Sequence, residues 1–130
     1  MQKALILIVD QSSATRAMYA DYLRYHGYGV AEASTSAEGM RLSHSLRPDL
    51  VVTELPADHE WVQAIRVLGR DGAARETAII ACSTQIDPRW PYVPEGVDVD
   101  RALPKPTSPR TLLDEVMRLL GHDAPEPVMA

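Results

Sequence analysis

The chain alternates between short apolar segments and longer amphipathic ones. The apolar segments are rich in Ile, Leu, Val and Ala and are too short for helices. They therefore predict strands buried on both faces of a parallel sheet. We expect five strands, at Ala4–Val9, Tyr28–Ala33, Leu50–Val52, Ala78–Cys82 and Asp98–Leu103.

The segments between the expected strands show helical spacing, with start and stop signals. Each can begin at a Ser or Thr whose side chain accepts from an orphan backbone N–H, and each ends near a Gly or Pro. We expect helices from Ser12 or Ser13 to Tyr25, from Thr35 or Ser36 to Pro48, at Asp58–Leu68, and from Thr107 or Ser108 to Leu120. The apolar face predicted for the first helix consists of Ala14, Ala17, Met18, Tyr22 and Tyr25.

Strands that alternate with helices predict an α/β fold, in which right-handed crossovers cover both faces of a parallel sheet. We therefore predict a doubly wound, five-stranded, three-layer sandwich. Three prolines, Pro88, Pro91 and Pro94, precede the fifth strand, so the fourth helix is expected to be short or missing. The length fits one domain, residues 1–121, followed by a flexible tail at 122–130.

Charge and composition exclude several classes of partner. The 130-residue chain has a net charge of −5 and no basic stripe, which argues against nucleic-acid binding. No apolar run approaches membrane-spanning length and no signal peptide is evident, so we expect a cytoplasmic protein without a membrane partner. The single cysteine, Cys82, lies in an apolar run and is expected to be a buried thiol.

Four polar residues fall at or just beyond the carboxyl ends of the expected strands: Asp10, Glu54, Ser83 and Lys105. In a doubly wound sheet these strand ends meet at one edge. Two carboxylates, a hydroxyl and a lysine would suit a site that handles a phosphoryl group or a metal. A salt-bridged polar edge without chemistry accounts for the same spacing equally well.

Four segments in order also resemble one protein family. L-I-V-D-Q at 7–11, P-D-L-V-V-T-E-L at 48–55, I-I-A-C-S-T at 79–84 and A-L-P-K-P at 102–106 are similar to segments of the receiver domains of two-component response regulators. The resemblance covers Leu5–Leu120. It implies a flavodoxin-like sandwich with strand order 2-1-3-4-5.

The resemblance also implies a role for each edge residue. Glu54 occupies the position of the phosphoacceptor, and Asp10 with Gln11 occupies the acidic pocket that holds magnesium. Ser83 corresponds to the switch hydroxyl and Lys105 to the invariant lysine, whose bond to Pro106 is often cis in this family.

Gln11, Glu54 and Ala102 depart from the family pattern. Gln11 replaces an acid, which weakens the magnesium site and leaves Asp10 as its one carboxylate ligand, so we expect no resident cofactor. Glu54 replaces an aspartate and moves the carboxylate outward by about 1.5 Å, which is enough to disturb in-line phosphoryl transfer. Ala102 replaces the aromatic switch residue. Together these changes predict a receiver that no longer turns over phosphate.

Three interpretations of Glu54 follow. It imitates the phosphorylated state, pairing with Lys105 and accepting a bond from Ser83, or it forms a fixed structural ion pair. The third interpretation is residual, magnesium-dependent phosphorylation on Glu54 or Asp58. A phosphoryl group brings a charge of about −1.5 to −2 and three acceptor oxygens, which a glutamate does not match.

The predicted function is therefore that of an atypical response-regulator receiver, a non-enzymatic signalling module that acts by binding. The expected partners are a histidine kinase, a phosphotransfer or effector protein, or a second copy of the chain. Trp90 and Tyr92, in a proline-rich segment, are candidate partner anchors, although both rings could instead fold back over the sheet. A small phosphotransfer enzyme or ligand-binding protein that uses Asp10, Glu54 and Lys105 is a weaker alternative, because the chain contains no glycine-rich phosphate loop.

Overall fold

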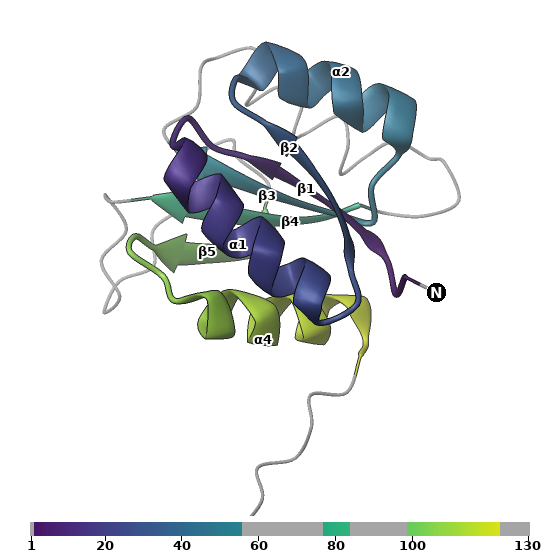
Figure 1. Ribbon diagram of the computed structural model, residues 1–130, viewed down its shortest axis with the longest axis vertical. Coiled ribbons are helices and arrows are strands. Elements are labelled where there is room, and N and C mark those ends of the chain that lie inside the picture. Colours follow the sequence, from purple (N-terminus) through teal and green to yellow (C-terminus); the bar gives the residue numbers. More distant parts are fainter. Residues whose placement is uncertain (1, 56–76, 84–98, 123–130) are drawn as a thin grey trace, which may run out of the picture.

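The computed structural model describes residues 2–55, 77–83 and 99–122, which form a parallel sheet flanked by helices (Figure 1). The strands are β1 (Leu5–Val9), β2 (Gly29–Ala33), β3 (Leu50–Leu55), β4 (Ala78–Ser83) and β5 (Arg101–Pro104). Their order is β2-β1-β3-β4-β5, and every neighbouring pair is parallel. The predicted α/β class, the doubly wound sheet and the strand order are confirmed.

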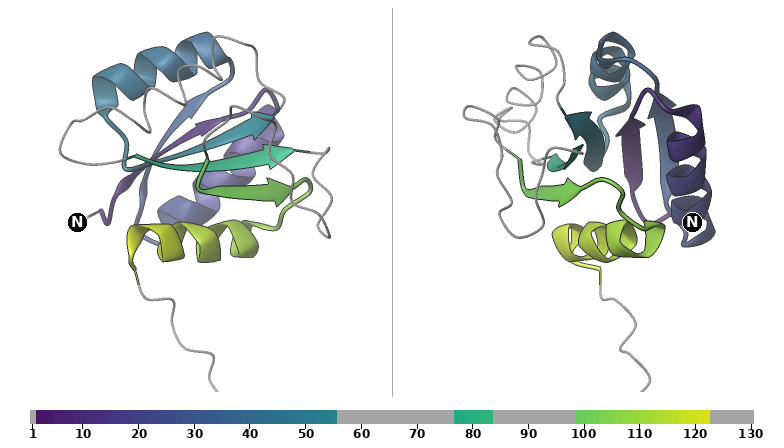
Figure 2. Two further views of the ribbon diagram at one scale, coloured as in Figure 1. Left: turned by 180° about the vertical axis from the view of Figure 1, so that it is seen from behind. Right: turned by 90° about the vertical axis from the view of Figure 1, so that its left-hand side faces the viewer.

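Helices cover both faces of the sheet, which gives the predicted three layers. Helices α1 (Ser13–Tyr25) and α4 (Pro109–Leu120) lie together on one face, and α2 (Ser36–Leu46) lies on the other (Figure 2). Because successive residues of a strand point to opposite faces, Ile6 and Ile8 pack under α1 and α4, whereas Leu7 and Val9 pack on the side of α2. The two faces explain why the central strands are apolar without alternation.

The predicted helix caps are confirmed. Ser12, Thr35 and Ser108 are the N-caps, and each side chain accepts a hydrogen bond from a backbone N–H in the first turn of its helix. Gly27, with φ 95°, follows the end of α1, and Gly121, with φ 72°, ends α4. Both glycines adopt the left-handed conformation that stops a helix.

The inward face of α1 differs from the prediction. Tyr19, Ala20 and Leu23 are buried, whereas Met18 is 45% exposed and Tyr25 is 86% exposed. Both stripes recur at helical spacing and both carry small and aromatic residues, so periodicity alone does not choose between them. The buried stripe contains Leu23, the single leucine of the helix, and Tyr19, whose hydroxyl donates to the carbonyl oxygen of Thr107.

Strand β5 begins at Arg101, three residues after the predicted start at Asp98. Asp100 accounts for part of this difference, because its carboxylate accepts a hydrogen bond from the Ile79 backbone N–H at 2.8 Å. The Ile79 N–H is thus bonded to a side chain, while the Asp100 N–H donates to the Ile79 carbonyl oxygen at 2.9 Å.

Several expectations lie outside the described residues. They are the helix predicted at 58–68, the short or missing fourth helix, and the tail from residue 123 onward. His122, which was assigned to the tail, is described and packs against Tyr28. Within the described residues, no helix combines the length and the apolar character needed to cross a membrane.

Candidate functional site

The strand register brings the predicted polar residues to one edge of the sheet. Val9 of β1 pairs with Thr53 of β3, so the residues that follow them, Asp10 and Glu54, emerge side by side. Across β4 the pairing continues from Ser83 to Pro104, the residue before Lys105. The expected convergence of the strand ends is therefore observed.

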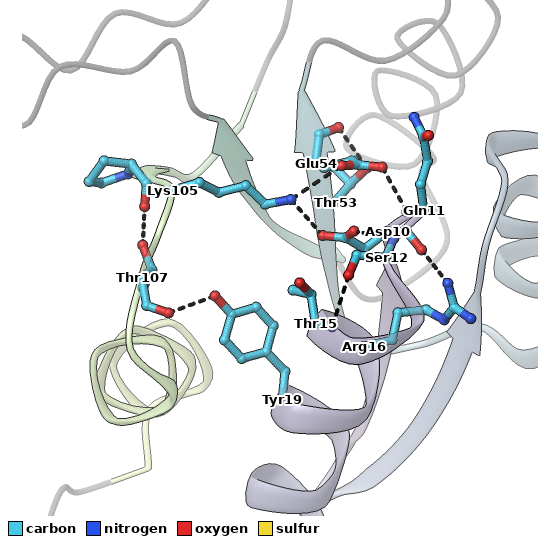
Figure 3. Close-up of polar contacts among 11 residues, drawn as sticks. Asp10, Gln11, Ser12, Thr15, Arg16, Tyr19, Thr53, Glu54, Lys105 and Thr107 are labelled. Carbon is cyan, nitrogen blue, oxygen red and sulfur yellow. Dashed lines mark hydrogen bonds and ion pairs between the residues drawn. The ribbon is translucent and has the colours of Figure 1, made fainter.

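Lys105 is the centre of this edge. Its ammonium donates to Oδ2 of Asp10 at 2.7 Å and to Oε2 of Glu54 at 3.2 Å (Figure 3). The side chains are 18% exposed for Lys105, 6% for Asp10 and 24% for Glu54. Two carboxylates and one ammonium leave this cluster, hereafter the carboxylate–lysine cluster, with a net charge of −1.

Protonation of the lysine is favoured by these contacts. Burial alone lowers the pKa of Lys105, because a charged group loses hydration. Hydrogen bonds to Asp10 and Glu54, together with their negative charges, outweigh burial and raise the pKa above its ordinary value of 10.5. The ammonium therefore remains charged at neutral pH.

The second oxygen of each carboxylate is held by the backbone at the start of α1. Oδ1 of Asp10 accepts from the N–H of Ser12 at 2.8 Å. Oε1 of Glu54 accepts from the N–H of Gln11 at 2.7 Å. All four carboxylate oxygens of the cluster thus accept a hydrogen bond, and both carboxylates have fixed orientations.

The loop that carries Lys105 is anchored by two hydrogen bonds to backbone carbonyls. The N–H of Lys105 donates to the carbonyl oxygen of Ser83 at 2.9 Å, and the hydroxyl of Thr107 donates to the carbonyl of Pro104. The Lys105–Pro106 peptide bond is cis, as the resemblance implied. The ammonium lies between the two carboxylates.

The other predicted site residues are placed less centrally. The side chain of Gln11 is exposed and its amide points away from the Asp10 carboxylate (Figure 3). Ser83 is buried at the end of β4, and Ala102 is half-buried in β5 beside Ala81. Trp90, Tyr92 and Asp58 lie outside the described residues.

The described residues do not fit a divalent metal in this arrangement. No three His, Cys, Asp or Glu side chains gather among residues 2–55, 77–83 and 99–122. The two carboxylates face an ammonium, so a dication would have to displace Lys105 or bind against it. The amide of Gln11 is moreover a poorer ligand for a hard cation than a carboxylate is.

Two residues that support the cluster were not predicted to do so. Arg16 donates to the carbonyl oxygen of Asp10 at 2.5 Å and lies 3.7 Å from a carboxylate oxygen of Glu32. The hydroxyl of Tyr19 donates to the carbonyl oxygen of Thr107 at 2.7 Å. Both bonds join α1 to backbone carbonyls, across 6 positions for Arg16 and 88 for Tyr19, and hydrophobic periodicity carries no signal for either.

No protein-family model matches the chain. Among curated proteins, the response regulator MprA of Mycolicibacterium vanbaalenii is 28% identical over 122 residues. The match covers 93% of this chain and 52% of that protein, so the chain spans about half the length of the relative.

Solved structures agree with this similarity. The chemotaxis response regulator CheY4 of Vibrio cholerae has a TM-score of 0.74 and 26% identity, with 89% of this chain and 98% of that one covered. A response regulator of Burkholderia multivorans has a TM-score of 0.72 and 25% identity, covering 94% and 98%. A response regulator of Thermotoga maritima, with a TM-score of 0.74 and 19% identity over 90% and 97%, shares the fold.

Proposed function

Since this chain is a receiver domain of the response-regulator type, we propose that it acts in two-component signalling as an atypical receiver that does not depend on phosphorylation. The observation that carries the proposal is the double contact of Lys105 with Asp10 and Glu54. At the position that the family resemblance assigns to the phosphoacceptor, the side chain is a glutamate engaged at both of its oxygens.

Phosphoryl transfer to Glu54 would require an oxygen aligned with the phosphorus of a donor. Oε1 accepts from the Gln11 N–H and Oε2 from the Lys105 ammonium, so attack would have to come from an oxygen whose orientation is already fixed by a hydrogen bond. A divalent ion could compensate, but Gln11 supplies no carboxylate to hold it. We therefore propose that a magnesium site at this edge is weak and that the protein has no resident cofactor.

We further propose that Glu54 is a fixed structural ion pair rather than a substitute for a phosphoryl group. Its single negative charge is offset by Lys105, which Asp10 shares. A phosphoryl group would carry about −1.5 to −2 and a third acceptor oxygen. With Ala102 in β5 there is also no ring at this position that could change its orientation with the state of the site.

A receiver without turnover works as a binding module rather than an enzyme. We propose a histidine kinase, a phosphotransfer or effector protein, or a second copy of the chain as partner. Met18 and Tyr25 are large exposed side chains of α1, so this helix is the surface on which we propose to look for partner contacts. The suggested contribution of Trp90 and Tyr92 remains a prediction.

The proposal is tested by incubating the protein with a small acyl phosphate and magnesium and measuring its intact mass. We expect no phosphoryl gain in the wild type or in Glu54→Gln. Uptake by the wild type that Glu54→Gln abolishes would overturn the proposal. Uptake that persists in Glu54→Gln would move the modification to another residue, such as Asp58.

A second variant tests whether Gln11 and Glu54 are the reason why the protein takes up no phosphoryl group. In Gln11→Asp/Glu54→Asp, both acids of the family pattern are restored at the carboxylate–lysine cluster. We expect this double variant to gain one phosphoryl group under the same conditions. If it does not, residues other than Gln11 and Glu54 disable the site.

A further inference from the structure

The loop that carries Lys105 is bound to α1 by a buried tyrosine. The hydroxyl of Tyr19 donates to the carbonyl oxygen of Thr107 at 2.7 Å, across 88 positions of sequence. Tyr19 is only 3% exposed and Thr107 is also buried. Figure 3 shows the tyrosine reaching from α1 to the loop just beyond Lys105.

This hydrogen bond is the second connection between α1 and the loop. The first is the contact of Lys105 with Asp10, whose carboxylate is held by the Ser12 N–H at the start of the helix. The backbone of Tyr19 lies seven residues beyond Ser12, or about 10 Å farther along the axis of α1 at the helical rise of about 1.5 Å per residue. Two connections separated in this way restrain the loop against rotation as well as displacement.

The chemistry of both partners favours a permanent bond. Burial raises the pKa of the Tyr19 phenol, so the hydroxyl keeps the proton that it donates. The buried carbonyl of Thr107 accepts this hydrogen bond, and without it the oxygen would lose a partner away from water, which is unfavourable.

We propose that Tyr19 is a positioning residue for Lys105. By fixing the carbonyl of Thr107, two residues beyond the lysine, it holds the loop where the ammonium contacts both Asp10 and Glu54. The ion pairs of the carboxylate–lysine cluster then depend on a hydrogen bond made inside the domain, away from the edge itself.

This inference concerns the same edge as the proposed function but does not depend on it. Phosphoryl uptake tests the proposed function, whereas the state of the Lys105 amine tests the role of Tyr19. Either result can fail while the other holds.

The experiment uses Tyr19→Phe, which removes the hydroxyl and keeps the ring. One neutral hydrogen bond is small against the total stability of a domain, so the variant is expected to remain folded. The chain contains two lysines, Lys3 and Lys105, so acetylation by an amine reagent at pH 8.5 can be followed at each by peptide mass spectrometry. Lys3 serves as the internal reference.

A matched control is available at the opposite end of α1. Tyr28→Phe also removes a buried tyrosine hydroxyl, which bonds to Nδ1 of His122 at 2.7 Å, far from Lys105. It keeps the aromatic ring that lies 5.4 Å from the Lys3 ammonium. This control separates a general loosening of the fold from a local effect on the loop.

We expect Tyr19→Phe to raise the acetylation rate of Lys105 relative to Lys3 by at least about threefold, because weaker contacts with Asp10 and Glu54 lower the pKa of the lysine and raise its free-amine fraction. The pKa of Lys105, measured by NMR on the labelled side chain, should fall as well. Tyr28→Phe should change neither quantity. The proposal would be overturned if Tyr19→Phe left the relative acetylation rate of Lys105 unchanged. It would also be overturned if this rate rose equally in Tyr19→Phe and Tyr28→Phe.

Discussion

The ammonium of Lys105 lies 2.7 Å from Oδ2 of Asp10, although the two residues are 95 positions apart in the sequence. This contact is shorter than the one to Glu54, and Asp10 is the less exposed of the two carboxylates. A poorly hydrated charge depends more on its counter-charge than a hydrated one does. We infer that Asp10 is the principal partner of Lys105 and that Glu54 adds to it.

Removal of the lysine should therefore destabilise the domain. In Lys105→Met, Asp10 and Glu54 would face each other without a cation, and we expect the free energy of unfolding to fall by about 2–3 kcal/mol. Urea denaturation monitored by circular dichroism measures this change. Arg110→Met is the control, because Arg110 and Asp114 form an exposed pair at 3.5 Å and should contribute less than about 0.5 kcal/mol. A similar loss of unfolding free energy in both variants would show that the carboxylate–lysine cluster contributes no more to stability than an exposed ion pair.

Cys82 should make the stability of the protein sensitive to alkaline pH. Burial raises the pKa of its thiol from 9.0 to about 12. Above pH 9 the unfolded chain releases this proton and the folded protein keeps it, so folding stability falls as pH rises. The slope should approach about 1.4 kcal/mol per pH unit.

The contribution of Cys82 can be isolated between pH 9 and pH 10. In this window the thiol of the unfolded chain ionises before the tyrosine hydroxyls and Lys105, whose ordinary pKa values are 10.0 and 10.5. Urea denaturation of the wild type and of Cys82→Ala across the window measures the difference in slope. Cys82→Ala should be less stable at pH 7 but should lose less stability with pH. Equal slopes for the wild type and Cys82→Ala would mean that the thiol ionises as readily in the folded protein as in the unfolded chain.

The convergence of Asp10, Glu54 and Lys105 could be predicted from the sequence, because each follows an apolar segment and parallel strands end at the same edge. The inward face of α1 could not. Its two stripes have similar spacing, and burial of Tyr19 depends on a carbonyl in a distant loop. Hydrophobic periodicity predicts which residues are buried. It does not predict the hydrogen-bond partner of a buried hydroxyl, because that partner depends on how the helices and strands pack together.

The contact of His122 with Tyr28 illustrates the same limit. The sequence assigned His122 to the tail, since it follows the glycine that ends α4. Its backbone N–H donates to Met117, its ring stacks on Tyr28 at 5.6 Å, and Nδ1 lies 2.7 Å from the tyrosine hydroxyl. A helix-stop signal therefore does not mark the last packed residue.

Loss of this contact should leave the Tyr28 hydroxyl without its partner. We expect His122→Ala to lower the free energy of unfolding by about 1–2 kcal/mol. The double variant Tyr28→Phe/His122→Ala should lose less free energy of unfolding than the sum of the losses in the two single variants. The difference, which is the coupling energy, should be at least about 0.5 kcal/mol. Urea denaturation of the four proteins provides the double-mutant cycle. Strictly additive losses would show that the two side chains do not stabilise each other.

Magnesium binding should be limited by the amide at position 11. Gln11→Asp would add a carboxylate beside Asp10, and the greater ligand charge should tighten magnesium binding by at least about tenfold. The backbone N–H of Ser12, which donates to Oδ1 of Asp10 at 2.8 Å, reports on the site when its NMR signal is followed during a magnesium titration. Gln11→Asn keeps an amide and should bind no better than the wild type. If the wild type already binds as tightly as Gln11→Asp, then neither Gln11 nor the Lys105 ammonium excludes the cation, and the weak magnesium site that we propose is wrong.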